Sequence, residues 1–252
     1  MKRLFLPLLI ILMLLALPAM AESPVELAEP LQGVYVWPEG SAESDALYVY
    51  RYCYPQIAGD SDIALLVNTT YAYAVEDALG FEIPMLASDM LEGDPQKLVE
   101  IDYTVTCHNA DYLSILIRKC VTVDGLATDV YSGHVIALTG SGAGRIVNLP
   151  VFLGLVDAEE TDEWLLTRQT NKADKAVREL VWSLMQSDKT TSSGLYDDLT
   201  FDELEAVFYP EEDFCLTEAG NPCFYFQPGV VAPEEEGFIT FEFPLDWLLD
   251  EI

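Results

Sequence analysis

The stretch "FCLTEAGNPCFYFQPGVVAPEEEGFITFEFP", from Phe214 to Pro244, decides the fold of this chain. Runs rich in Phe and Tyr alternate with turn residues, which predicts two or three short strands. Gly220 suits the left-handed position of a three-residue hairpin loop. That turn places Cys215 and Cys223 directly opposite each other, close enough for a disulfide. We therefore expect the last strands of the protein to begin with a tight hairpin that carries a bridge.

The residues before this stretch predict two helices. The longer one is expected from Lys172 to Gln186, where Asn171 and Asp174 resemble a capping box. Thr200 and Glu203 form a second capping box ahead of a short helix. The apolar face of the longer helix has helical spacing and consists of Ala173, Ala176, Val177, Leu180, Val181, Leu184 and Met185.

Farther towards the N-terminus, strand patterns alternate with one more helix pattern. The order strand, helix, strand, strand, followed by hairpin, helix and strands, predicts an α+β fold in which antiparallel-rich sheets pack against helices. The expected elements are a strand from Leu47 to Ile57, a helix from Asp60 or Ser61 that Gly80 stops, strands from Val99 to Cys107 and from Tyr112 to Val123, and a hairpin of Val130 to Leu138 with Arg145 to Val151.

The first residues have the pattern of a Sec signal peptide. Lys2 and Arg3 precede an apolar run, and Ala19-Met20-Ala21 forms a cleavage site. The run is shorter than the ~20 apolar residues of a transmembrane span. We therefore expect cleavage after Ala21 and a secreted or periplasmic protein without membrane insertion, with a retained anchor as the alternative. The expected division is a signal peptide (1–21), a leader (22–45), an N-terminal strand-helix-hairpin half (46–128) and a C-terminal α+β half (129–252).

The charge of the chain restricts its partners. The formal net charge is −31, and loss of Lys2 and Arg3 with the signal peptide makes it two units more negative. Such a surface repels nucleic acid and anionic lipid, and it attracts cationic proteins. We expect no nucleic-acid partner.

The remaining cysteines are expected to form a second bridge, because an oxidising compartment favours pairing. Cys107 and Cys120 are predicted to point to opposite faces of neighbouring strands, so they should not bond. That leaves Cys53 as the partner of one or the other.

A row of tyrosines is the strongest candidate for ligand contact. Tyr48, Tyr50 and Tyr52 share one face of a strand. Exposed, the row would stack on sugar rings or on a partner protein, whereas packing beneath a helix is the competing interpretation. The acidic loops Asp157 to Glu163 and Glu234 to Glu236 are the other candidate contacts.

No catalytic, metal-binding or cofactor-binding residue can be singled out. The two histidines, His108 in a predicted turn and His134 in a predicted strand, accompany no nucleophile motif. The glycines between Gly140 and Gly144 join two predicted strands, whereas a phosphate loop joins a strand to a helix. The acidic clusters lack the spacing of an EF-hand. We expect no cofactor.

In its order of motifs the chain resembles the extracytoplasmic module shared by the anti-sigma factor RsiV and the peptidoglycan deacetylase PdaC, a family made largely of proteins of unknown function. The residues that carry the resemblance are Tyr54 to Gly59, Tyr103-Thr104-Val105, Tyr112 to Ile115, Phe214 to Thr217 with Gly220, Tyr225-Phe226, Ala232-Pro233, Gly237 and Phe243-Pro244. The chain departs from the family at Asp124 to Ala127, where the family usually has Gly-Gly-Ala-His.

The resemblance implies a role at the cell envelope. RsiV-like modules sense lysozyme, and PdaC-like proteins carry a deacetylase domain that is not expected here. We therefore expect an exported, non-catalytic binding or sensing module that recognises a lysozyme-like basic protein or peptidoglycan. The alternative is a secreted hydrolase of wall glycans that uses acidic residues.

Overall fold

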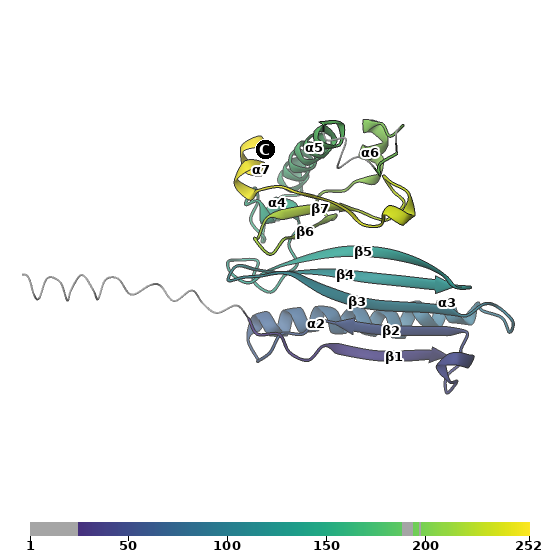
Figure 1. The fold of residues 1–252 in the computed structure, drawn as a ribbon. Coiled ribbons are helices and arrows are strands. Elements are labelled where there is room, and N and C mark those ends of the chain that lie inside the picture. Colours follow the sequence, from purple (N-terminus) through teal and green to yellow (C-terminus); the bar gives the residue numbers. More distant parts are fainter. Residues whose placement is uncertain (1–24, 188–193, 197) are drawn as a thin grey trace, which may run out of the picture.

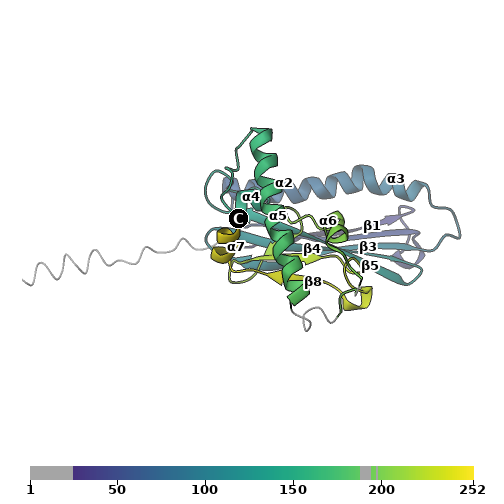
Figure 2. The same ribbon diagram turned by 90° about the horizontal axis from the view of Figure 1, so that it is seen from above.

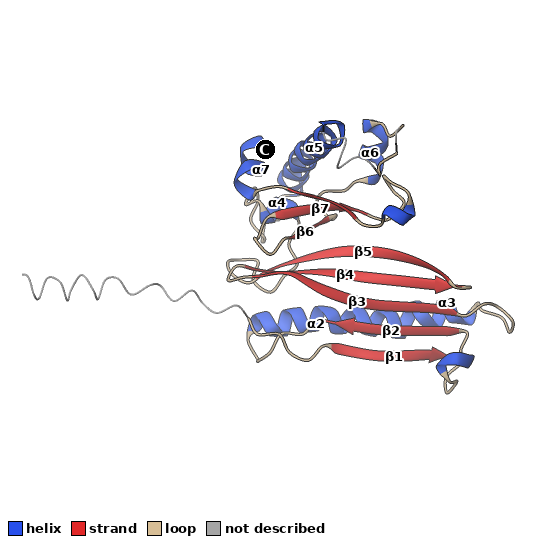
Figure 3. Ribbon diagram, in the orientation of Figure 1, coloured by secondary structure: helices blue, strands red, loops and turns tan. Residues whose placement is uncertain are grey.

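The computed structural model describes residues 25–187, 194–196 and 198–252. The predicted signal peptide lies outside these residues. The fold is α+β, as predicted, with two antiparallel-rich sheets and helices packed against them (Figure 1, Figure 3). Its elements are β1 (Leu31–Trp37), η1 (Glu43–Asp45), β2 (Tyr48–Tyr54), α2 (Asp62–Asp77), η2 (Ala78–Glu82), α3 (Ile83–Ser88), β3 (Lys97–His108), β4 (Tyr112–Val123), β5 (Leu126–Ala137), α4 (Leu149–Phe152), α5 (Glu163–Ser187), α6 (Phe201–Val207), β6 (Phe214–Leu216), β7 (Pro222–Phe226), η3 (Glu234–Glu236), β8 (Ile239–Glu242) and α7 (Leu245–Glu251).

The first sheet contains five strands in the order β1-β2-β3-β4-β5. β2 and β3 are parallel and are connected through α2 and α3, while the other pairs are antiparallel. The predicted leader contributes β1, which pairs with β2 along its whole length. The two strands predicted from Val99 and from Tyr112 are confirmed, with β3 beginning two residues earlier than expected.

One face of the first sheet is covered by α2 and α3, which run in line along it (Figure 2). Ser61 caps α2, since its hydroxyl accepts a hydrogen bond from Ala64 N–H at 3.1 Å. Gly80 does not stop the helix as predicted. It lies in the π-helical turn η2, which leads directly into α3. A π turn widens a helix by one residue without breaking it, so the buried positions stay on the side that faces the sheet.

The second sheet, β6-β7-β8, lies between the first sheet and the C-terminal helices (Figure 1). Cys215, Cys223 and Tyr225 pack against Leu116 and Tyr131 of the first sheet. The opposite face of the second sheet forms the largest core with α4, α5, α6 and α7, to which it contributes Phe214, Leu216, Phe224, Phe226 and Phe241. All residues of β7 are therefore buried.

Two expectations for the C-terminal half are wrong. The residues from Arg145 to Val151 form one isolated bridge, Ile136 with Ile146, and then enter α4, because the side chain of Asn148 accepts from Val151 N–H and caps a helix there. The long helix α5 begins at Glu163, where the Asp162 carboxylate accepts from Trp164 N–H at 3.0 Å. The predicted cap therefore lies inside α5.

The predicted capping box and the predicted hairpin are confirmed. The capping box at Thr200 is present at the start of α6. Cys215 pairs directly with Cys223 across the predicted hairpin, whose Gly220 has a φ of +82°. None of the helices in residues 25–187, 194–196 and 198–252 has the length and hydropathy that a bilayer crossing requires.

Candidate functional site

On the face opposite α2, the second sheet packs against β4, β5 and the end of β3, and this face is open over β1, β2 and the first part of β3. A shallow depression lies there, and we call it the charged groove; it is lined by Gln32, Gly33, Val34, Arg51, Tyr52, Cys53, Glu100, Ile101 and Asp102. Gly33 pairs with Tyr52, and a Cβ at Gly33 would overlap the tyrosine ring. The missing side chain thus lets the Tyr52 ring lie over the edge strand β1.

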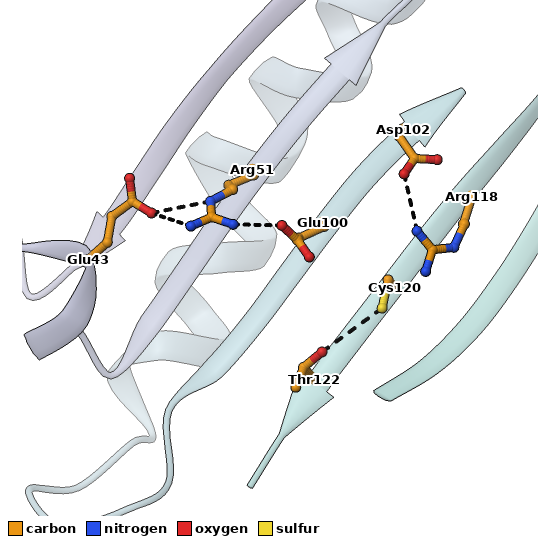
Figure 4. A network of polar contacts seen from close by, with 7 residues as sticks. All are labelled: Glu43, Arg51, Glu100, Asp102, Arg118, Cys120 and Thr122. Carbon is orange, nitrogen blue, oxygen red and sulfur yellow. Dashed lines mark hydrogen bonds and ion pairs between the residues drawn. The ribbon is translucent and has the colours of Figure 1, made fainter. Parts of the chain in front are cut away.

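Arg51 organises one half of the charged groove (Figure 4). Its guanidinium donates to Glu43 at 2.6 Å and to Glu100 of the neighbouring strand at 2.7 Å. The side chains are about half exposed. Hydrogen bonds to the Glu43 and Glu100 carboxylates raise the pKa of Arg51 above its ordinary value. Arg51 thus connects η1, which lies eight residues before it in the chain, with β3, which lies 49 residues after it.

Arg118 of β4 organises the other half. It donates to Asp102 at 3.2 Å, and its second terminal nitrogen lies 2.9 Å from the Asp129 carboxylate (Figure 4 shows the first of these contacts). The groove and its rim thus contain four carboxylates and two guanidinium groups, arranged as two clusters in which each arginine contacts two carboxylates. The two clusters together are net negative, and the side chains of Glu43, Glu100 and Asp102 remain partly exposed to solvent.

The cysteines near the groove are not arranged for a bridge. Cys53 lies on β2 and Cys120 on β4, with β3 between them. Two strand spacings amount to about 10 Å, beyond the ~7 Å at which Cα atoms can be bridged. Cys107 lies at the far end of β3, beyond a bulge that turns its side chain into the C-terminal core. The predicted pairing of Cys53 with Cys107 or Cys120 is therefore wrong, because the topology separates them.

A second depression, the acidic pocket, lies where the edge of β5 meets the loop that precedes β6. It is lined by Tyr131, Ser132, Gly133, His134, Ile146, Val147, Asn148, Glu211, Glu212, Asp213, Phe214 and Tyr225. Burial raises the pKa of Asp213 to about 6, although Tyr209 N–H donates to its carboxylate at 3.0 Å. The carboxyl group of Asp213 therefore keeps its proton to a higher pH than an ordinary aspartate does, and it lines this pocket.

Beside the acidic pocket, two carboxyl groups face each other. Asp174 of α5 is 4% exposed. Burial, with the neighbouring Glu211 carboxyl as the next cause, raises the pKa of Asp174 to about 8. Asp174 Oδ1 and Glu211 Oε2 have no donor within the described part of the chain, so a hydrogen bond between them requires one of the two to be protonated. Arg178 lies 3.9 Å from Asp174.

The candidate tyrosines lie on the helix side of the first sheet. Tyr48 and Tyr50 are each 3% exposed and pack with Ala78, Ile83 and Ala87, while Tyr52 is half-buried. The row is therefore packed beneath a helix, as in the competing interpretation, and is not an exposed surface. The reason is that α2 continues through η2 into α3 and covers the strand. As the molecule stands, Tyr48 and Tyr50 are not available to a ligand.

Cys215 and Cys223 lie directly opposite each other, yet all five thiols of the chain are free in this structure. The two sulfurs share a hydrogen bond, which is the largest cause of a raised pKa at Cys215 and of a lowered pKa at Cys223. The disulfide between them stays a prediction.

Both histidines lie within or at the end of strands of the first sheet. His108 is the last residue of β3. His134 stacks on Tyr71 of α2, and its Nδ1 lies 3.1 Å from the tyrosine hydroxyl. Burial lowers the pKa of His134. In the described residues no group of three or more His, Cys, Asp or Glu side chains is arranged to hold a metal ion.

Sequence reasoning missed both depressions. Glu43, Arg51 and Glu100 come from three different elements, and no local pattern brings them together. The only local signal was the alternation of Arg51 with the tyrosines, which placed its side chain on the opposite face of the strand.

Part of the chain matches a known protein family. Residues 165–246, from α5 to the start of α7, match the family described as "Protein of unknown function (DUF3298)". A crystal structure of a DUF3298 family protein from Pseudomonas aeruginosa PAO1 has a TM-score of 0.53 at 13% identity, covering 92% of this chain and 95% of that one. A DUF3298 family member from Bacteroides fragilis NCTC 9343 has a TM-score of 0.47 at 14% identity, covering 89% and 92%. No curated protein matches this chain. The likeness to the Pseudomonas protein concerns the fold.

Proposed function

We propose that this chain is an exported, non-catalytic binding module of the cell envelope that recognises a basic protein such as lysozyme. The charged groove carries the proposal. Four carboxylates surround two arginines on an open sheet face, so basic side chains of a partner can exchange into an existing network. The formal net charge of −31 favours the approach of such a partner. The resemblance to the RsiV and PdaC module, and the signal-peptide pattern, support the same location and role.

Binding at physiological salt tests this proposal. At about 0.15 M salt the Debye length is ~8 Å, so diffuse attraction is largely screened. We expect lysozyme to bind more tightly than a second protein of equal positive charge, and purified peptidoglycan to bind weakly. Glu100→Gln with Asp102→Asn should weaken binding, whereas Asp250→Asn with Glu251→Gln, which removes equal charge at the C-terminus, should not. If both basic proteins bind equally well, the protein does not recognise lysozyme specifically and the proposal fails. If only peptidoglycan binds tightly, the ligand is peptidoglycan and not a basic protein.

One observation favours a second candidate, a hydrolase of wall glycans. Glycoside hydrolysis uses a carboxylic acid with a raised pKa beside a second carboxylate. Asp213 has a pKa of about 6 and lies in the acidic pocket with Glu211 and Glu212. Incubation of the purified protein with peptidoglycan and with acetylated glycans tests it. Product release that is lost in Asp213→Asn would establish the hydrolase and overturn the non-catalytic proposal.

A further inference from the structure

We propose that the outer face of α2 and α3 is a docking surface for a cationic amphipathic helix of the partner, with one basic side chain seated in a cleft at the π-helical turn. This inference rests on the proposed function, because it names a surface through which a basic partner is held. It concerns the face of the protein opposite the charged groove.

The outer face of these helices exposes several large apolar residues, where solvent exposure predicts mostly polar ones. Their inner positions, among them Tyr71, Val75 and Ile83, are buried against the first sheet. A surface helix normally places charged or polar residues on the other side. Here that side exposes Leu65, Leu66, Tyr73, Phe81, Met85 and Leu86, followed by Leu91 after α3. Exposed apolar patches with a polar rim mark interaction sites.

The π-helical turn shapes a cleft within this patch. The cleft is lined by Tyr73, Glu76, Asp77, Gly80 and Phe81. Tyr73 is 65% exposed and Phe81 is 63% exposed, so each ring offers much of its surface to a ligand. Gly80 contributes no side chain, and no atom lies within 4 Å of the position of a Cβ there, which leaves the floor of the cleft open. π turns inside α-helices occur frequently at functional sites.

The chemistry of the cleft fits one ligand group. Two carboxylates lie beside two aromatic rings, and an ammonium or guanidinium group interacts favourably with both. The apolar residues on either side, Leu65 on α2 and Met85 on α3, extend the surface along the helix axis. An amphipathic helix binds such a surface through apolar anchors at helical spacing.

The negative charge of this face disfavours the other occupants. No Lys, Arg or His occurs from Tyr52 to Gln96, and the acidic residues on α2 and η2 include Asp62, Glu76, Asp77 and Glu82. A second copy of the chain would bring the same acidic surface against it. Anionic lipid headgroups would be repelled as well. A partner segment that is both apolar and basic is the occupant that complements the patch.

The test uses the full chain and a designed helical peptide of Leu and Lys with its lysines along one stripe. A twin peptide carries Glu in place of Lys. Calorimetric titration at about 0.15 M salt should show binding of the Lys peptide and none of the Glu peptide. Tyr73→Ala with Phe81→Ala should weaken the Kd about tenfold or more, as expected for truncated aromatic anchors. Glu76→Gln with Asp77→Asn should also weaken it.

Two matched controls separate this surface from general effects. Leu126→Ala removes an exposed apolar side chain elsewhere, and Glu234→Gln with Glu235→Gln removes equal charge from η3. Both should bind the Lys peptide as the wild type does, and thermal unfolding should show that every variant is folded. Equal weakening by the controls would overturn the proposed surface.

The outcomes also separate this inference from the proposed function. If lysozyme binds and the Lys peptide does not, the docking surface is wrong and the binding module stands. If the peptide binds but the Tyr73 and Phe81 variant binds it equally well, the surface is again wrong. If neither ligand binds the wild type, both proposals fail. Self-association that Phe81→Ala abolishes would identify a second copy as the occupant and would overturn the inference.

Discussion

Gly133 of β5 donates its backbone N–H to the hydroxyl oxygen of Tyr225 of β7 at 2.6 Å, and this hydrogen bond joins the two sheets. A Cβ at Gly133 would overlap the carbonyl oxygen of Phe214, so the edge of the first sheet touches the backbone of the second. Gln227 makes two further bonds with the backbone of Tyr131 nearby. The position of the acidic pocket depends on these contacts.

Removal of the Tyr225 hydroxyl should destabilise the protein. Tyr225→Phe keeps the buried ring but leaves the Gly133 N–H without its acceptor, and an unsatisfied buried donor costs about 1–3 kcal/mol. Chemical denaturation should show this loss in the free energy of unfolding. Tyr73→Phe, which removes an exposed hydroxyl, serves as the control. Equal stability of the Tyr225→Phe protein would mean that water replaces the hydroxyl.

A side chain at Gly133 should be destabilising as well. Gly133→Ala places a methyl group against the Phe214 carbonyl, and such overpacking typically costs about 1–3 kcal/mol. Gly80→Ala is the matched control, since its Cβ meets no atom within 4 Å. We expect the thermal midpoint of Gly133→Ala to fall and that of Gly80→Ala to stay or rise. A tolerated Gly133→Ala would contradict the close contact.

The Asp174 and Glu211 pair predicts a pH dependence of stability. The pKa of Asp174 rises from 3.8 to about 8 on folding, so the folded state binds the proton more tightly than the unfolded state. Its contribution is therefore fully present below the ordinary pKa and is lost as the pH rises through about 8. The free energy of unfolding should decrease from acidic to alkaline pH, and Asp174→Asn should remove most of that slope. Denaturation curves at several pH values measure it, with Asp250→Asn as the control.

Oxidation should join Cys215 to Cys223. Residues directly opposite in a hydrogen-bonded antiparallel pair have Cα atoms about 5.5 Å apart, which suits a disulfide. A loop this short should gain roughly 2–3 kcal/mol from the bridge. Peptide mapping without reductant, before and after mild oxidation, would detect the bridge. Cys215→Ala should abolish the gain, and mapping that joins Cys53 to Cys107 or Cys120 would contradict the strand order.

Regular alternation and capping residues made much of the fold predictable. β3 and β4 have long runs with a period of two, and Thr200 with Glu203 marks the start of α6. These signals are local, because they depend on neighbours within one element. The Cys215 and Cys223 register is local in the same sense, since a tight turn sets it.

The parts that were missed depend on distant partners. β1 contains Gly33 and is defined by pairing with β2, which its own sequence does not reveal. Gly80 is a usual helix stop, but buried contacts of Ile83 and Ala87 with the sheet continue the helix past it. The short apolar run after Arg145 fits either a strand or a helix. It forms the helix α4 because the side chain of Asn148 caps the N-terminus of that helix. The charged groove brings together residues from different strands, and their spacing in the sequence does not predict that they meet.

The crossover between β2 and β3 also has a consequence for folding kinetics. The β3, β4 and β5 meander closes through turns of a few residues, whereas Arg51 and Glu100 are 49 residues apart when they meet. Closing the longer loop costs about 2 kcal/mol more in chain entropy. We therefore expect the meander to form first and β1 and β2 to join it late in folding. Pulsed hydrogen exchange during refolding should protect the amides of β4 before those of β2, and simultaneous protection would contradict this order.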